Sequence, residues 1–356
     1  MKILQVIPTL GNGGAEHLVF ELSNELCRQG HQVEILTLYD VPKDNSLRKS
    51  LDNRITVYSL SKKHGFDIRI FFSLWRFVIK RHYDVVHGHV SAIKYLALAA
   101  FMSSKVRFVA TIHSEARREA GKNIDKWTRR MMFGMNKCIP VTISEESELS
   151  FESFYGRKGT LICNGVSDYT KQKEVKLRDN ENQIIFLHPA RCQPVKNQAL
   201  LLAAFKKLIE GGYDAKLIWV GSNKSYMDLF NSLAPLMKKK VSYLGVVDNV
   251  RDYMASSDAV CLSSKMEGMP MTVIEAFSVG RPVLCTPVGG CLNIIKQGKN
   301  GMMSEDLGME SYYNVLEKYV KSTQEERSRM SANASASFGL YSIESCATRY
   351  LKVYQS

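Results

Sequence analysis

Residues 3–38 read ILQVIPTLGNGGAEHLVFELSNELCRQGHQVEILTL and predict the class of fold. An apolar run at 3–7 is followed by a glycine-rich loop, an amphipathic stretch at about 16–28 and a second apolar run at 31–38. This order predicts a β-α-β unit, in which the strands are parallel and the crossover is right-handed. Similar runs recur to about Lys321, so we predict an α/β protein with doubly wound parallel sheets.

The loop after the first strand contains Gly13 and Gly14, which would let a phosphate or sugar approach bare backbone. The dinucleotide pattern G-x-G-x-x-G needs a glycine at position 16, where this sequence has Glu16. A nicotinamide-dependent dehydrogenase is therefore disfavoured. A tight turn explains the two glycines equally well, so the loop alone leaves both interpretations open.

Length and composition indicate two globular domains. The 356 residues suffice for two domains, and a content of 45% hydrophobic and 23% charged residues is typical of a soluble protein. We predict a first domain at 1–168, a polar linker at 169–182 and a second domain at 183–339. A final helix at about 343–354 follows Ser342 as its N-cap. The eight scattered cysteines include no C-x-x-C pair, which favours reduced thiols over a zinc site.

The clearest ligand-binding signal is EGMPMTVIE, residues 267–275. Pro270 suits the first turn of a helix, so we predict a helix over 271–279 that ends at Gly280. The unpaired N–H groups and positive dipole end at its N-terminus suit a phosphate. Glu267, just before the helix, and Glu275, one to two turns into it, are placed to bind hydroxyls on either side of that phosphate. Hydroxyls flanking a phosphate indicate a nucleotide sugar.

Two further groups of polar residues lie at predicted strand ends. Arg191 and Lys196 share the loop between a predicted strand at 183–188 and a predicted helix at 198–209, where two cations suit a pyrophosphate. His87, His89 and His113 come at the ends of two strands of the first domain, where ligands of parallel sheets bind. We expect His113 to face a substrate and His87 to be a packed strand residue. The absence of H-E-x-x-H disfavours a zinc site.

The net charge of +13 is concentrated in residues 43–137, which hold 20 Lys and Arg against 7 Asp and Glu. This predicts an anionic partner, with solvated helix faces as the equal alternative. A predicted helix at 70–79 has two apolar stripes, for which burial in the core is favoured over a membrane face. A basic stretch at 117–137 contains Trp127 and fits either a surface helix or a peripheral membrane contact.

Together these features resemble the retaining glycosyltransferases of the GT-B fold, family 4. The resemblance covers essentially the whole chain and is carried by G-G-A-E at 13–16, Arg-x4-Lys at 191–196 and Glu-x7-Glu at 267–275. It implies two Rossmann-like domains that face each other across a cleft, with residues 340–356 crossing back to the first domain. It also implies transfer of a sugar, with retention, from a nucleoside-diphosphate sugar to a hydroxyl of a glycan or lipid-linked oligosaccharide.

The resemblance further implies roles for individual residues. Glu267 would hold the donor sugar, Glu275 would bind the ribose hydroxyls, and His113 would lie near the reacting sugar. Arg191 and Lys196 would neutralise the departing pyrophosphate, so neither a metal ion nor another cofactor is expected. The other implied donor-binding residues are Gly13, Gly14, Val246, Gly268, Met269, Pro270, Met271 and Thr272.

The basic, aromatic-bearing stretch leads us to expect a polyprenyl-diphosphate-linked acceptor and a role in surface or capsular polysaccharide synthesis. The protein would then be cytoplasmic and act at the inner face of the cell membrane, with region 43–137 against anionic lipid. The alternatives are a nucleotide-sugar epimerase of the same fold and a non-catalytic nucleotide-sugar binder. Nucleic-acid binding is not expected, because charge alone supports it and no recognised module is present.

Overall fold

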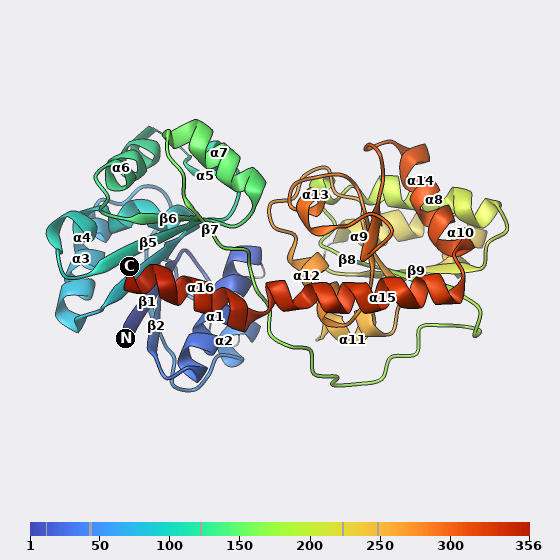
Figure 1. The fold of residues 1–356 in the computed structure, drawn as a ribbon, viewed down its shortest axis with the longest axis horizontal. Helices are drawn as coiled ribbons and strands as arrows, with labels where there is room; N and C mark the ends of the chain where they lie inside the picture. Colours follow the sequence, from blue (N-terminus) through green and yellow to red (C-terminus); the bar gives the residue numbers. More distant parts are fainter. Residues whose placement is uncertain (12, 43–44, 122, 223, 248) are drawn as a thin grey trace. The chain divides into compact units, whose positions relative to one another are not determined.

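The computed structural model describes residues 1–11, 13–42, 45–121, 123–222, 224–247 and 249–356. Asn12 of the glycine-rich loop and three residues of the basic region, Lys43, Asp44 and Lys122, lie outside these ranges. Two compact units are present, one formed by Met1–Ser167 with Tyr341–Ser356 and the other by Asp168–Leu340 (Figure 1). Each is built on a parallel sheet, which confirms the α/β prediction.

The sheet of the first unit has the strand order β3-β2-β1-β4-β5-β6-β7. Its strands are β1 (Lys2–Ile7), β2 (Gln32–Thr37), β3 (Thr56–Ser59), β4 (Val85–His89), β5 (Arg107–Ile112), β6 (Ile139–Thr142) and β7 (Thr160–Leu161). The chain runs outward from β1 to β3 and then returns to β4 on the other side of β1. The strand order therefore reverses between β1 and β4.

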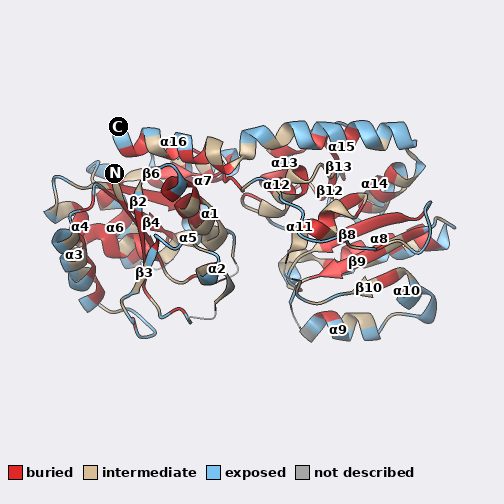
Figure 2. Ribbon diagram, turned by 90° about the horizontal axis from the view of Figure 1, so that it is seen from below, coloured by how far each residue is buried: buried red, intermediate tan, exposed pale blue. Residues whose placement is uncertain are grey.

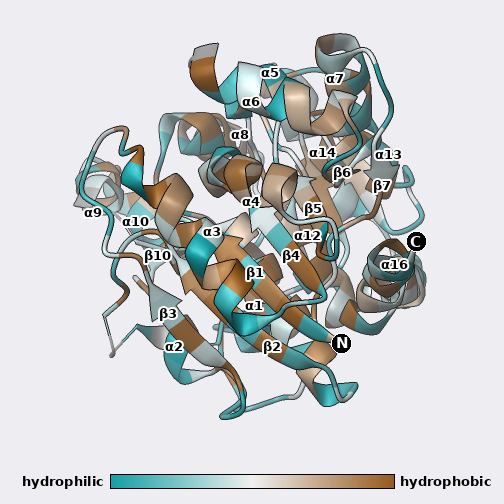
Figure 3. Cartoon of the chain, turned by 90° about the vertical axis from the view of Figure 1, so that its left-hand side faces the viewer, coloured by the Kyte–Doolittle hydropathy of each residue, from teal (hydrophilic) through white to brown (hydrophobic). Residues whose placement is uncertain are grey.

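Alternate residues of these strands enter two hydrophobic clusters, one on each face of the sheet. Leu4 and Val6 of β1 lie in one cluster, and Ile3 and Ile7 lie in the other. Strands buried on both faces are expected to be continuous hydrophobic runs rather than alternating ones. Figure 3 shows mainly hydrophobic residues in β1 and β2, where Gln5 and Glu34 interrupt the apolar runs, and Figure 2 shows strand residues as largely buried.

Helices cover both faces of the first sheet. They are α1 (Gly14–Arg28), α2 (Ser46–Lys49), α3 (Arg69–Arg81), the 3₁₀ helix η1 (Val90–Leu96), α4 (Ala97–Met102), α5 (Ala116–Glu119), α6 (Asn123–Gly134), α7 (Glu145–Tyr155) and α16 (Ile343–Gln355). The predicted N-cap of the last helix is confirmed, because the Ser342 side chain accepts a hydrogen bond from the backbone N–H of Ser345. Helix α16 packs against α1 (Figure 1).

His87 and His89 lie at the C-terminal end of β4, as predicted, and both are fully buried. Strand β4 pairs with β5 along its whole length and with β1 over Val85–Gly88. Strand β7 is only two residues long, Thr160–Leu161, and does not continue to Val166. Val166 instead forms an isolated parallel bridge with Ser342, which joins the C-terminal segment to this unit.

The apolar stripes of the predicted helix at 70–79 have different environments. In α3 the residues Leu74 and Val78 are buried, and Phe71 packs partly buried against the same cluster. Phe72 and Ile79 of the second stripe remain 54% and 42% exposed. The core interpretation is confirmed for the first stripe, while the second leaves apolar surface on a helix that ends in Lys80 and Arg81.

The sheet of the second unit has the strand order β10-β9-β8-β11-β12-β13. Its strands are β8 (Ile184–Pro189), β9 (Ala215–Val220), β10 (Val241–Tyr243), β11 (Ala259–Leu262), β12 (Val283–Cys285) and β13 (Gly301–Met303). Here the order reverses between β8 and β11. The helical elements are the 3₁₀ helix η2 (Pro194–Lys196), α8 (Gln198–Glu210), α9 (Lys224–Asn231), α10 (Pro235–Lys240), α11 (Val250–Ala255), α12 (Met271–Ser278), α13 (Cys291–Ile294), α14 (Met309–Lys321), α15 (Gln324–Phe338) and the 3₁₀ helix η3 (Gly339–Tyr341).

Helix α15 is the main element that the hydrophobic pattern does not predict. It buries only Met330 and Ala334 and has an exposed outer face (Figure 2). Its sequence signal is a capping box, in which the Thr323 side chain accepts from the N–H of Glu326 and the Glu326 carboxylate accepts from the N–H of Thr323. Helix α15 packs against α12, the helix of the Glu-x7-Glu stretch.

The polar stretch predicted as a linker packs on the second unit. The carboxylate of Asp252 accepts hydrogen bonds from the hydroxyl of Tyr169 and from the backbone N–H groups of Gln172 and Lys173. Residues 168–182 therefore belong to this unit by their contacts. Within the described ranges, none of the helices is both long and apolar enough to cross a membrane.

Candidate active site

The reversal point of the second sheet brings two predicted loops together. Strands β8 and β11 are neighbours, and the loops that carry Lys196 and Glu267 follow their C-terminal ends. The side chain of Ser263 donates to the Lys196 carbonyl at 2.9 Å, and the N–H of Lys265 donates to the Val195 carbonyl at 2.8 Å. Ligands of doubly wound sheets bind at such reversal points, beyond the carboxyl ends of the strands.

At the centre of this site Lys196 and Glu267 form an ion pair. Nζ of Lys196 lies 2.6 Å from Oε1 of Glu267, and the side chains are only 24% and 10% exposed. The hydroxyl of Ser264 donates to the same carboxylate oxygen at 2.5 Å. The 3₁₀ helix η2 and the left-handed conformation of Asn197, with φ 50°, turn the chain between Lys196 and α8. An ammonium and a carboxylate are thus held side by side at the strand ends.

The loop from Glu267 to Pro270 is packed against a glycine. The N–H of Gly290 donates to the Gly268 carbonyl at 2.8 Å, and a Cβ on Gly290 would lie 2.7 Å from that oxygen and 2.9 Å from Cδ of Pro270. Only glycine permits this approach. The helix that follows runs from Met271 to Ser278, so Pro270 is its N-cap rather than a residue of its first turn.

The remaining predicted donor-side residues come from three segments of the second unit: the loop after β8, the loop after β10, and the stretch that leads into α12. Arg191 is exposed in the loop after β8, and Val246, in the loop after β10, is 73% exposed. Asp248, two residues further on, lies outside the described residues. Met269 is buried, whereas Met271 and Thr272 at the start of α12 are partly exposed. Burial raises the pKa of Glu275, and the positive charge of Arg251 acts in the opposite direction.

The reversal point of the first sheet carries the other predicted residues. The loop after β1 leads into α1, whose N-cap is Gly13 and whose first residue is Gly14, two residues before the predicted start. Glu16 lies in the first turn of α1, where a carboxylate interacts favourably with the helix dipole. His113 follows β5, next to β4 in the sheet.

The three histidines at these strand ends have distinct environments. His87 is bonded on both ring nitrogens, to the hydroxyls of Tyr354 and Thr111, each at 2.7 Å, as the packed-residue interpretation requires. His89 lies between Gln5 and His113, at 2.8 and 3.0 Å. Burial lowers the pKa of His113 to about 3, so its ring is neutral near pH 7. Nδ1 of His113 is buried and has no hydrogen-bond partner among the described residues.

Among the described residues, no group of three or more His, Cys, Asp or Glu side chains is placed to hold a metal ion.

Comparison with known proteins assigns the family. Residues 12–168 match the family described as Glycosyltransferase Family 4, and residues 170–337 match Glycosyl transferases group 1. The two matches together span nearly the whole chain. The chain belongs to glycosyltransferase family 4.

Individual relatives of this glycosyltransferase cover most of its length. It is 27% identical to the UDP-Gal:alpha-D-GlcNAc-diphosphoundecaprenol alpha-1,3-galactosyltransferase of Escherichia coli, over 70% of each chain. It is 26% identical to the GalNAc-alpha-(1->4)-GalNAc-alpha-(1->3)-diNAcBac-PP-undecaprenol alpha-1,4-N-acetyl-D-galactosaminyltransferase of Campylobacter jejuni, over 85% of this chain and 84% of that one.

A solved structure confirms the fold of the glycosyltransferase. The crystal structure of HepE from Anabaena in complex with UDP superimposes with a TM-score of 0.82 at 19% identity and covers 100% of both chains. Two Rossmann-like units with parallel sheets, as predicted, are the elements of the GT-B fold.

Sequence reasoning does not identify several residues that shape these loops of the enzyme. On the donor side, Ser264 and Gly290 were not predicted. The glycine pair at 289–290, which follows a strand, is a signal from which Gly290 could have been predicted. Glu119 and Arg129, which contact the backbone around His113 and His89, have no local pattern at all. Arg129 was expected on the basic surface, and this is wrong, because its side chain is fully buried in ion pairs.

Proposed function

We propose that the enzyme transfers a glycosyl group, with retention and without a metal ion, from a nucleoside-diphosphate sugar to a hydroxyl group. The observation that carries this proposal is the pairing of Lys196 with Glu267 directly before the N-terminus of α12. A pyrophosphate needs positive charge and free N–H groups, and a sugar needs acceptors for its hydroxyls. The two adjoining loops, one with Lys196 and the other with Glu267, supply both kinds of group.

The proposed chemistry concentrates on the leaving group. The bond between the anomeric carbon and the phosphate oxygen breaks while the acceptor hydroxyl attacks from the same face, and its proton passes to the departing phosphate. Arg191 and Lys196 would stabilise the negative charge that develops there, which is usually the largest contribution to such catalysis. Glu267, held by Ser264 as well as by Lys196, is proposed as a ligand of sugar hydroxyls. Glu275 is proposed as the ligand of the ribose.

Residues of the first unit are proposed to contact the transferred sugar or the acceptor. The neutral ring of His113 retains an unpartnered, buried Nδ1, and a buried polar atom without a partner calls for an explanation. A substrate hydroxyl that donates to this nitrogen supplies one. Gly13 and Gly14 would let a phosphate or hydroxyl reach the start of α1.

The acceptor is proposed to be a polyprenyl-diphosphate-linked glycan in surface polysaccharide synthesis at the cytoplasmic face of the membrane. The names of the Escherichia coli and Campylobacter jejuni relatives both specify undecaprenol-linked diphosphate acceptors. Exposed apolar residues of α3, Phe72 and Ile79, lie on a helix with exposed Arg76 and Lys80. Such a helix can lie on an anionic lipid surface.

The test begins with a thermal-shift screen of UDP, GDP, ADP and dTDP sugars, since a donor held at many times its Kd stabilises the protein. The donor that stabilises is then incubated with and without a polyprenyl-diphosphate-linked acceptor, and the product is examined by NMR. We expect an acceptor-dependent product whose anomeric configuration matches that of the donor. Inversion would overturn the retaining mechanism. Conversion of the donor without any acceptor would indicate the epimerase, and binding without turnover would indicate a non-catalytic binder.

A further inference from the structure

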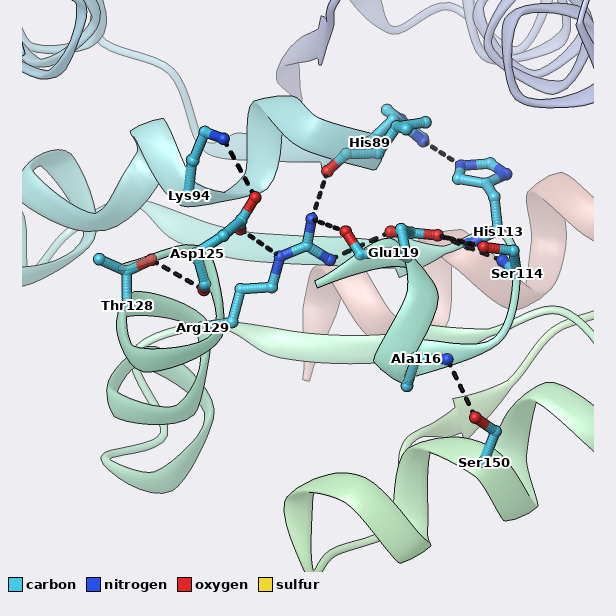
Figure 4. Close-up of polar contacts among 11 residues, drawn as sticks. His89, Lys94, His113, Ser114, Ala116, Glu119, Asp125, Thr128, Arg129 and Ser150 are labelled. Carbon is cyan, nitrogen blue, oxygen red and sulfur yellow. Dashed lines mark hydrogen bonds and ion pairs between the residues drawn. The ribbon is translucent and has the colours of Figure 1, made fainter. Parts of the chain in front are cut away.

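The loops that carry His89 and His113 are joined by one buried guanidinium. The side chain of Arg129 is 0% exposed and makes ion pairs with Glu119 at 3.1 Å and Asp125 at 2.8 Å (Figure 4). Its NH2 group also donates to the Val90 carbonyl at 2.8 Å. Burial lowers the pKa of Arg129, but the two carboxylates more than offset this and raise it, so the guanidinium stays charged.

Each partner of Arg129 reaches one of the two histidine loops. Oε2 of Glu119 accepts hydrogen bonds from the backbone N–H groups of His113 at 2.7 Å and Ser114 at 3.2 Å (Figure 4). Val90 follows His89 directly and has φ of 53°, a left-handed conformation that is a genuine outlier for a β-branched residue. Backbone of this kind persists only where its surroundings hold it, and it is common at functional sites. Arg129 is one of the groups that hold it.

The hydrogen bonds between the side chains determine which nitrogen of His113 carries a proton. The Gln5 amide is oriented with Oε1 toward His89, at 2.8 Å from its Nε2. An amide oxygen only accepts, so in this orientation His89 is protonated on Nε2 and its Nδ1 is an acceptor. Nε2 of His113 lies 3.0 Å from that Nδ1 and must donate to it. Because the ring of His113 is neutral, its Nδ1 keeps a lone pair, and this is the atom without a partner.

We propose that Arg129, acting through Glu119 and the Val90 carbonyl, is a positioning residue that fixes His113 with Nδ1 as an acceptor for a substrate hydroxyl. This inference rests on the proposed function. It assigns to Arg129 the placement of the two histidine loops, which neither His89 nor His113 could achieve alone. If the two loops moved apart, the bond between His89 and His113 would break, and the proton of His113 could move to Nδ1. His113 would then lose its position, and its Nδ1 could no longer accept a hydrogen bond from a substrate hydroxyl.

The first test is Arg129→Met, with Arg157→Met as the matched control. Arg157 also donates from a guanidinium to a backbone carbonyl, that of Phe133 in α6, but it contacts neither histidine loop. We expect Arg129→Met to lower kcat by about ten- to hundredfold, the effect of a misplaced reacting group, with the donor Kd within about twofold of wild type. Arg157→Met should leave kcat and Kd unchanged. An Arg129→Met enzyme with wild-type kcat overturns the proposal.

The second test separates positioning from folding. ¹⁵N NMR of the wild type should show His113 protonated on Nε2 and unprotonated on Nδ1, and the opposite tautomer overturns the proposal. If Arg129→Met does not fold, Glu119→Gln is measured in its place. This variant keeps an oxygen for the N–H groups of His113 and Ser114 but loses the charge that pairs with Arg129. Glu119→Gln should lower kcat and change the His113 spectrum, and wild-type values of both would also overturn it.

A double variant provides a further check. Arg129→Met leaves Glu119 as a buried carboxylate without its guanidinium, whereas Arg129→Met with Glu119→Gln removes both charges. The double variant should therefore recover part of the kcat lost in Arg129→Met, and a further loss contradicts the proposed pairing. If the wild type transfers no sugar at all, the proposed function is wrong instead. The NMR measurement would still show which nitrogen of His113 carries the proton.

Discussion

Lys196 and Glu267 are 71 positions apart in the sequence, yet their charged atoms lie 2.6 Å apart. An ion pair of this kind orients both side chains before a ligand arrives. A donor pyrophosphate would compete with Glu267 for the ammonium, while Ser264 would keep the carboxylate in place. At the scale of single residues, the pair is thus a candidate for preorganised binding rather than for stability, since partly exposed pairs contribute little to folding.

The first prediction concerns the two cations. Arg191→Ala or Lys196→Ala should each lower turnover by roughly two powers of ten, as expected when a stabiliser of developing charge is removed. Turnover is measured at saturating donor, so that weaker binding does not hide the effect. Lys206→Ala is the control, because Lys206 is an exposed residue of α8 whose ion-pair partner among the described residues is Glu210 on the same helix. Near-normal turnover in either variant would rule out the assigned role.

At the scale of elements, the donor-side loop depends on the close approach of Gly290. We predict that Gly290→Ala weakens donor binding and lowers stability by about 1–3 kcal/mol, because the added Cβ would clash with the Gly268 carbonyl and Pro270. Isothermal titration and thermal melts measure the two effects. Gly339→Ala serves as the comparison, since no described residue beyond the adjacent chain has an atom within 4 Å of its added Cβ. Equal donor affinity in both variants would show that the loop tolerates the shift.

Helix α3 is the element on which the membrane proposal can be tested. Replacing both Phe72 and Ile79 with serine should lower sedimentation with anionic vesicles at low salt by at least about tenfold, because each buried apolar side chain contributes about 1.5–3 kcal/mol. Leu149→Ser is the matched variant, as Leu149 is 68% exposed on α7 of the same unit. If wild-type protein does not sediment, or if the double variant sediments equally, α3 is not a membrane contact.

At the scale of the whole molecule, buried neutral histidines make stability depend on pH. Burial lowers the pKa of His188 to about 4 and of His113 to about 3, from an ordinary value of 6.5. Below about pH 6.5 the unfolded chain therefore takes up protons that the folded chain does not. The stabilisation is complete above that pH and is lost as pH falls toward the folded values, by about 1.4 kcal/mol per pH unit for each histidine.

We therefore predict that melting temperature falls with acidification, and that His188→Asn reduces the slope. Asparagine keeps a donor for the Cys261 carbonyl, to which Nδ1 of His188 donates at 2.9 Å, but it takes up no proton. His64→Asn, at an exposed position, should leave the slope unchanged. Parallel slopes for wild type and His188→Asn below about pH 6 would contradict this assignment. Calorimetry is suitable because it resolves separate transitions in a chain with two units.

The sequence by itself determined the α/β class, the helix of the Glu-x7-Glu stretch and the capped C-terminal helix. These features depend on consecutive residues: apolar runs long enough for buried strands, a proline and glycines at loop positions, and a serine before a helix. Helix α15 shows the limit of that reasoning, since its polar surface hides it from the hydrophobic pattern and only its capping box reveals it.

Only the tertiary structure decided which loops meet. Strand order placed β8 beside β11 and β4 beside β5, and thereby paired Lys196 with Glu267 and His89 with His113. It also buried Arg129, whose basic neighbours in the sequence predicted an exposed position. The physical reason is that side chains far apart in the sequence interact at distances of a few ångströms, and strand order, which no local pattern contains, determines those distances.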